Sequence, residues 1–438
     1  MIITRNQIIN NFAWLLSSNI GSTLCNTIFS LWLARLLSPS DFGIIAISLF
    51  YFNCFNLIVN WGWRQGFMAH RDIDLNTAAS THFWIRFFLG GVPLAIILMG
   101  KPLVSVHILT THYSVIVILS LVYWIERLGL THRLVLEKTY QLRILAWLEG
   151  SATLLGYLLA IAAAKQGWGI YSLVVQSFVT KGFAAIGYVI ASPWKIGFAF
   201  DKNVAKLFFR TFGYATWLSG VFGLMLYHFM PFLIGMLSDT YQAGLYAKAF
   251  MIATFPLSIT DIFERLTTPL YSAFQKSTVD LKNVFFKTQA FKLFLLVPAQ
   301  VMMGITASTW VPFILGRQWV PMIPIYHALI IYGIFRAFFD DVPALFLYGF
   351  KSPWELTYNQ IGQALFIVII GPLFVFYHQA FGGACAIAIM MCLATTHFWM
   401  LVFKKIQSTP RDFLISCASM PSTLKNISAR SFQDNKTL

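Results

Sequence analysis

Three asparagines and an arginine recur at helical spacing within one stretch of the sequence: Asn53, Asn56, Asn60 and Arg64. Side chains three or four residues apart share one face of a helix, so the four would form a polar stripe. Amides can hydrogen-bond hydroxyl groups, and a guanidinium matches phosphate oxygens with two parallel bonds. The stripe therefore predicts binding of a hydroxyl-rich, phosphate-bearing molecule. Alternatively, Arg64 is an ordinary basic anchor at the end of a membrane span.

A second polar face precedes this stripe. Ser18, Ser22 and Asn26 lie four residues apart in the first predicted span, beside a second polar row of Asn19, Thr23 and Thr27. In a lipid environment such a face must contact protein or water. Two interpretations remain open, which are the lining of an aqueous cavity and close packing between helices through small residues. We expect this row and the asparagine row to face a shared aqueous space.

Positive charges inside apolar segments are the next candidates. Lys248 and Arg336 both lie within such segments, and a charge inside a membrane span is costly and usually functional. A phosphate-bearing ligand in a medium of low dielectric needs positive charge nearby. We therefore predict that Arg64, Lys248 and Arg336 bind the anionic group of the ligand.

Acidic and aromatic residues complete the candidate set. Asp340 and Asp341 lie in the same apolar segment as Arg336, and Arg336 and Asp340 could pair because they are four residues apart. Together with His228, the two aspartates are candidates for coupling to an ion, although a lone histidine can also be a hydrogen-bonded packing residue. Tyr227 is a candidate for lining the cavity, and Pro231 predicts a kink beside it.

The composition identifies the medium in which these residues act. Hydrophobic residues make up 58% of the 438 residues, charged residues only 11%, and mean hydropathy is +0.69. Soluble proteins carry about 25% charged residues. The chain is therefore an integral membrane protein, which excludes a water-soluble enzyme, a disordered chain and a disulfide scaffold. The net charge of +15 is attributed to basic cytoplasmic loops rather than to nucleic-acid binding.

Apolar segments bounded by charges or turn residues predict an all-α protein with about twelve transmembrane helices. They lie near residues 12–34, 42–62, 79–99, 113–130, 146–164, 168–191, 212–237, 244–264, 288–309, 324–348, 356–377 and 381–403. With a cytoplasmic N-terminus, the outside loops hold few basic residues: Arg35, Lys101, Lys165 and Arg317. This asymmetry predicts that both termini are cytoplasmic.

An internal repeat divides the chain. The segment LARLLSPSDFGIIA (33–46) is similar to LIGMLSDTYQAGLYAKA (233–249), and the match places Gly43 on Gly244. The offset corresponds to six predicted helices, so the repeats would be parallel, as in transporters with a site between two lobes. We therefore predict a six-helix bundle over residues 1–200, a second over residues 201–403 and a cytoplasmic polar tail over residues 404–438.

At these segments the sequence resembles the Wzx-like polysaccharide flippases of the multidrug/oligosaccharidyl-lipid/polysaccharide exporter superfamily. The resemblance runs from LARLLSPSDFGIIAIS through FLIGMLSDTYQAGLYAKAFMIATFPLSI to FILGRQWVPMIPIYHAL. It implies two bundles around a central cavity, in the MATE-like arrangement of that superfamily. The chain departs from the family at HFMPFLIG, where Met230 stands near a position that is often acidic.

The same resemblance implies outward movement of undecaprenyl-diphosphate-linked oligosaccharide across a bacterial inner membrane. Its implied partners are the polyprenyl-diphosphate-linked glycan, membrane lipid and a polysaccharide polymerase or chain-length regulator. The glycan would be a repeat unit of O-antigen, capsule or exopolysaccharide.

Two other functions remain alternatives. A drug or cation antiporter of the same superfamily would need acidic groups deep in the bundle, and this chain has few. A membrane polysaccharide polymerase or ligase would usually carry a long outside loop, and the predicted outside loops are short. We find no nucleotide-binding loop, hydrolase elbow or zinc motif in the sequence. We therefore expect neither an enzyme nor a cofactor.

The predicted topology can be tested with reporter fusions along the chain. Fusions after Lys165 and after Arg317 should report the outside, and fusions after Arg210 and after Lys405 should report the cytoplasm, because basic loops are retained inside. An outside C-terminus would contradict both the number of spans and the parallel repeat.

Overall fold

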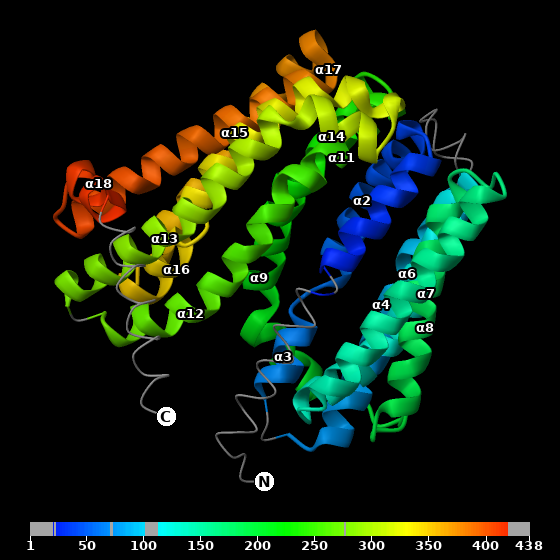
Figure 1. Cartoon of the computed structure of the whole chain (residues 1–438). Coiled ribbons are helices and arrows are strands. Elements are labelled where there is room, and N and C mark those ends of the chain that lie inside the picture. Colours follow the sequence, from blue (N-terminus) through cyan, green and yellow to red (C-terminus); the bar gives the residue numbers. More distant parts are fainter. Residues whose placement is uncertain (1–20, 22, 71–72, 101–112, 276, 419–438) are drawn as a thin grey trace, which may run out of the picture. The chain divides into compact units, whose positions relative to one another are not determined.

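The computed structural model describes residues 21–418 apart from residues 22, 71–72, 101–112 and 276. The described residues form helices and connecting turns, and no β-strand occurs among them (Figure 1). The chain divides into two compact units. The first contains Met1–Gly244 with Ile314–Gln318, and the second contains Leu245–Phe313 with Trp319–Leu438.

The first unit is built around four long helices. α6 packs against both α4 and α8, and α7 packs against α8 (Figure 1). Its labelled helices are α2 (Pro39–Val59), α3 (Trp63–Ala69), α4 (Leu75–Gly100), α6 (Tyr113–Lys138), α7 (Leu142–Lys165), α8 (Tyr171–Ala191), α9 (Lys202–Tyr227) and α10 (Phe229–Leu237). Residues 23–36 are also helical, and α11 (Thr240–Thr254) begins at the end of this unit.

The helix that carries the asparagines is sharply delimited. Ser38 caps α2, because its hydroxyl accepts from the Asp41 amide while the Asp41 side chain accepts from the Ser38 amide. At the other end Asn60 is the C-cap, and Gly62 has a left-handed φ of 70°. Arg64 therefore belongs to the separate helix α3. The prediction of one continuous stripe from Asn53 to Arg64 is wrong for this reason.

A bend separates α9 from α10. The two helices meet at an angle of 48° around His228. Pro231 lacks an amide hydrogen and its ring crowds the carbonyl four residues earlier, so the regular bonding of α9 ends at Tyr227. The kink predicted from Pro231 is confirmed.

The second unit contains three long helical segments that pack together, α13, α15 and α17 (Figure 1). The elements that follow α11 are η1 (Phe255–Ile259), α12 (Thr260–Ala273), α13 (Thr278–Ile305), α14 (Ala307–Ile314), η2 (Arg317–Met322), α15 (Ile323–Phe339), α16 (Val342–Ala344), η3 (Leu345–Gly349), α17 (Pro353–Lys405) and α18 (Pro410–Ala418). α17 is broken at His378 and Gln379, where Gln379 has a φ of 49°, so it consists of two helical halves.

Part of the predicted polar tail is ordered as a helix. α18 packs against α13, with Phe413 buried. Lys282 of α13 pairs with Asp412 across a distance of 3.0 Å. The Thr409 amide and then Lys282 hold the pKa of the Asp412 carboxyl below its usual range. The predicted polar tail, residues 404–438, therefore contains one helix, α18, which belongs to the second unit.

The helices confirm the predicted class of an all-α membrane protein. Within the described part of the chain, eight helices are long and apolar enough to cross a membrane, or nine if α9 and α10 form one broken span. Large apolar side chains such as Phe88, Ile186 and Ile190 are exposed on them, as expected for surfaces in contact with lipid. The count of twelve spans and the boundary at residue 200 remain predictions, since residues 1–20 and 101–112 lie outside the description.

The two glycines that align in the internal repeat also pack against one another. A Cβ atom added to Gly43 of α2 would lie 1.8 Å from the carbonyl oxygen of Thr240. A Cβ atom added to Gly244 would lie 1.8 Å from the carbonyl oxygen of Pro39. The contact is therefore reciprocal between the first turn of α2 and the first turn of α11. Only glycine permits the two backbones to approach so closely.

Replacing either glycine of this contact should force the two helix ends apart. We expect Gly43→Ala and Gly244→Ala each to destabilise the purified protein by about 1–3 kcal/mol, the usual cost of overpacking. The measurement is the thermal unfolding midpoint in detergent. Gly223→Ala is the matched control, because a Cβ atom there meets nothing within 4 Å. Equal midpoints for all three variants would contradict the close contact.

Candidate functional site

The asparagine row of α2 meets arginines from two other helices of the first unit. The Asn56 carbonyl oxygen accepts a hydrogen bond from Arg127 of α6. The Asn60 carbonyl oxygen accepts from Arg86 of α4 at 3.1 Å. Asn53 instead donates to the carbonyl of Leu49 within its own helix, at 2.8 Å. Two of the three predicted asparagines therefore hold guanidinium groups in place.

These arginines belong to a partly buried group of charges. Arg86 is only 2% exposed. Lys181 of α8 pairs with Glu126 at 2.7 Å and lies 3.5 Å from the centre of the Tyr123 ring. Glu126 also interacts electrostatically with Arg86 and Arg127. We name Arg86, Arg127, Lys181 and Glu126 the cationic cluster. It contains three basic groups and one carboxylate, so it carries excess positive charge.

A small pocket opens beside this cluster. It lies among α2, α4 and α6, and its polar walls are Asn56, Ser120, Tyr123 and Arg127. Amide, hydroxyl and guanidinium groups thus converge within the first unit. The volume of the pocket is about 20 Å³, so it admits a single oxygen of a phosphate or hydroxyl group, and these side chains suit such an oxygen.

Sequence reasoning missed the residues that form this cluster. Arg86 lies inside the predicted span 79–99 but was not considered as a ligand, and Arg127 was counted only among the basic residues of the cytoplasmic side. Their position within spans was the available signal. Their asparagine partners lie 26 and 71 residues away in the chain, so the pairing depends on tertiary structure.

Arg64, the first predicted ligand of the anionic group, lies in a different network. Its guanidinium donates to both carboxylate oxygens of Glu137, at 3.2 and 3.3 Å, and its side chain is 49% exposed. Glu137 also pairs with Arg133, which in turn pairs with Glu149. Arg64 is thus neutralised by a carboxylate, whereas Arg86 and Arg127 are held by neutral amides.

The remaining candidates of the first unit are dispersed. Ser18 and Ser22 lie outside the described residues, so their predicted row has no structural account. Asn26 and Tyr227 are exposed on their helices, and His228 forms the junction of α9 and α10.

The two predicted aspartates of the second unit bind different partners. Arg336 forms an ion pair with Asp340, as the four-residue spacing predicted, and Asp340 also accepts from Thr260 at 3.0 Å. Asp341 is buried and accepts hydrogen bonds from Thr267 at 2.9 Å and from Tyr271 at 2.8 Å. The two aspartates thus tie α12 to the end of α15.

A lysine that was not proposed as a ligand lies close to these carboxylates. Lys292 of α13 is fully buried, and its ammonium makes no hydrogen bond among the described residues. Its largest electrostatic attraction is to Asp341. Lys248 of α11 is also buried. Within the described part of the chain, no group of three or more His, Cys, Asp or Glu side chains could hold a metal ion.

Three bacterial proteins from polysaccharide gene regions or pathways are similar to this chain. Lipopolysaccharide biosynthesis protein WzxC of Escherichia coli K12 is 19% identical over 77% of this chain and 70% of its own length. An uncharacterized membrane protein in the cps region of Klebsiella pneumoniae is 22% identical over 83% of this chain and 75% of its own length. Succinoglycan biosynthesis transport protein ExoT of Rhizobium meliloti is 22% identical, with coverage of 75% and 66%.

Solved structures share the fold. An inward-facing MATE-family multidrug resistance transporter superposes with a TM-score of 0.68, at 14% identity, over 88% of this chain and 94% of its own. The lipid II flippase MurJ superposes with a TM-score of 0.65, at 12% identity, over 96% of this chain and 93% of its own. The sequence matches the family described as polysaccharide biosynthesis protein over residues 32–324, which is well over half of the chain. The chain therefore belongs to this family of polysaccharide biosynthesis proteins, as a Wzx-like member with the fold of MATE and MurJ transporters.

Proposed function

We propose that this chain is a flippase that moves a polyprenyl-diphosphate-linked oligosaccharide from the cytoplasmic to the outer leaflet of a bacterial inner membrane. The observation that carries the proposal is the cationic cluster of the first unit. Its arginines are held by the neutral side chains of Asn56 and Asn60, so their charge remains available to an anionic ligand.

The charge of the cluster suits the charge of the proposed substrate. An anion in a medium of low dielectric is strongly unfavourable unless it is paired and hydrogen-bonded. The diphosphate carries about two negative charges, and three basic groups exceed Glu126 by two. Arginine also offers planar, bidentate recognition of phosphate. A substrate cation would be repelled by the same charges, which disfavours the antiporter alternative.

The direction of transport agrees with the membrane potential. An inside-negative potential favours outward movement of an anion by about 2.3 kcal/mol per charge per 100 mV. At 100 mV, two charges therefore contribute about 4–5 kcal/mol. We propose that the substrate crosses by alternating access, with its glycan in a polar cavity and its polyprenyl chain in lipid.

The second unit supplies the candidate for ion coupling. Asp340 and Asp341 are joined to α12 by hydrogen bonds, and Lys292 is the nearby buried cation. We propose that this set responds to an ion, and that Arg336 belongs to it through its ion pair with Asp340. We also propose that Lys248 contributes further positive charge and that both termini are cytoplasmic. A polysaccharide polymerase or chain-length regulator is the proposed partner in the membrane.

Removing charge from the cluster should abolish export. We expect Arg86→Gln and Arg127→Gln each to lower glycan export about tenfold to a hundredfold, because one charge-assisted hydrogen bond contributes about 1.5–3 kcal/mol. The measurement is surface polysaccharide in a deletion strain, together with mass analysis of the accumulated polyprenyl-diphosphate glycan. Arg210→Gln is the matched control, since Arg210 is exposed on α9. Normal export by both cluster variants at normal protein level would contradict the proposed role.

A second test places a negative charge on Asn56, the amide that binds Arg127. Asn56→Asp preserves the shape of the side chain but places a carboxylate beside Arg127. We expect export to be lost while the unfolding midpoint is unchanged or raised, because Arg127 would gain an ion pair. Asn56→Ala should retain more export than Asn56→Asp, because it leaves the positive charge in place. If Asn56→Asp exports normally, the free charge of Arg127 is not required.

A further inference from the structure

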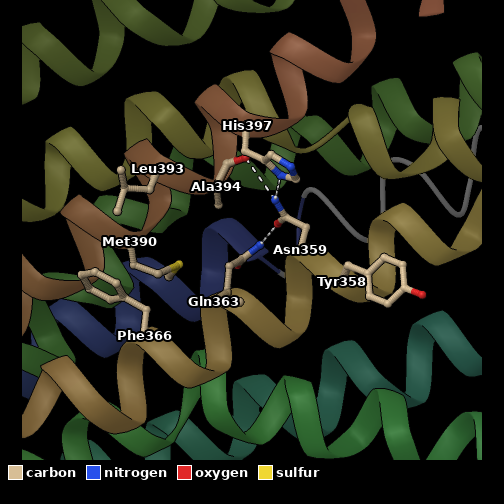
Figure 2. Close-up of a pocket in the computed structure, with 9 residues that line it drawn as sticks. Tyr358, Asn359, Gln363, Phe366, Met390, Leu393, Ala394 and His397 are labelled. Atoms are coloured by element: carbon tan, nitrogen blue, oxygen red, sulfur yellow. Dashed lines mark hydrogen bonds between the residues drawn. The ribbon is translucent and has the colours of Figure 1, made fainter.

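The two halves of α17 enclose a pocket that the proposed transport mechanism does not use. Its volume is about 300 Å³, and it lies within the second unit (Figure 2). Figure 2 shows the side chains of Asn359 and Gln363 directed between the two halves, with Phe366 and Met390 beside them. The lining contains two amides, one histidine, the phenol of Tyr358 and apolar side chains, and no lysine, arginine or carboxylate.

A chain of hydrogen bonds forms the polar side of this pocket. Asn359 and Gln363 are only 6% and 4% exposed. The Asn359 amide donates to the Ala394 carbonyl at 3.2 Å and lies 3.2 Å from Nδ1 of His397 (Figure 2). Gln363 in turn donates to the carbonyl oxygen of Asn359. Because Asn359 presents a donor to Nδ1, this nitrogen accepts, and neutral His397 carries its proton on Nε2.

The second nitrogen of His397 is therefore a donor without a protein partner among the described residues. His397 is exposed, although it lies within an apolar helix that is long enough to cross a membrane. A donor on such a surface is unfavourable unless something other than hydrocarbon accepts its hydrogen. The neighbouring Leu393 is also exposed, so the pocket is open on this side. The occupant must combine a hydrogen-bond acceptor with an apolar chain.

The position of His397 along the helix indicates which acceptor is present. The second half of α17 begins after the break at His378–Gln379 and ends at Lys405. Lys405 pairs with Glu355 at 2.9 Å, as expected for a region of lipid head groups. At about 1.5 Å per residue, His397 lies about 26 Å along the helix from Ala380. Taking the break as one edge of a hydrocarbon layer about 30 Å thick, we infer that His397 lies near the opposite edge. This depth is close to that of the ester carbonyls of a phospholipid.

We propose that this pocket binds a membrane phospholipid, whose glycerol ester carbonyl accepts the hydrogen bond from Nε2 of His397. One acyl chain lies against Phe366, Met390 and Leu393. The neutral lining disfavours the diphosphate of the transported lipid, whose polyprenyl chain also lacks an ester oxygen at this depth. The site is therefore separate from the cationic cluster and serves a resident lipid of the bilayer.

Photocrosslinking of the full-length chain tests this site. The photoreactive residue p-benzoylphenylalanine replaces Leu393, and the protein is reconstituted in vesicles of diester phosphatidylethanolamine and phosphatidylglycerol with a small fraction of undecaprenyl phosphate. We expect a phospholipid adduct by mass spectrometry. His397→Phe and Gln363→Leu should each lower its yield at least threefold. Diether phospholipids lack ester carbonyls. In vesicles of these lipids, the chain that carries only the photoreactive residue at Leu393 should show a similarly lowered yield.

The control places the photoreactive residue at Leu373, an exposed position on α17 that does not line the pocket. Its yield should be the same in all variants and in both kinds of vesicle. The proposal is overturned if the Leu393 adduct does not decrease with diether lipid. It is also overturned if the adduct is undecaprenyl phosphate or a second copy of the chain.

Discussion

A polar group inside a bilayer has no water to bind, so the protein must supply its partner. This constraint accounts for the contacts that hold each unit together. In the first unit Asn56 and Asn60 accept hydrogen bonds from Arg127 and Arg86. In the second, Asp341 accepts from Thr267 and Tyr271. The apolar faces of the same helices contact lipid, so these polar contacts determine which face of each helix lies inward.

The constraint also distinguishes structural from functional charge. Arg64 is bound by Glu137, and Arg336 by Asp340, so each of these cations has an opposite charge beside it. Arg86 and Arg127 are fixed by amides instead, and Glu126 is the one carboxylate of their cluster. A protein that only needed packing would gain little from a partly buried excess of positive charge. A protein that moves an anionic lipid head group needs such an excess.

The sequence predicted the features that depend on local spacing. Composition and hydropathy predicted an all-α membrane protein, Pro231 predicted the bend at His228, and the spacing of Arg336 and Asp340 predicted their ion pair. The aligned glycines of the repeat, Gly43 and Gly244, also proved to be in contact. Features that depend on tertiary structure were not predictable. Arg64 lies off the asparagine stripe because the chain turns at Gly62.

Transport by purified protein tests the central claim most directly. Polyprenyl-diphosphate glycan isolated from a deletion strain would be incorporated into vesicles with the protein, and the fraction protected from an impermeant glycan-oxidising reagent would be followed with time. The account predicts that the wild-type chain makes the protected fraction accessible much faster than protein-free vesicles do, and that a correctly folded Arg86→Gln/Arg127→Gln chain does not. Equal rates for the wild-type chain and the double variant, or no acceleration by folded wild-type protein, would contradict it.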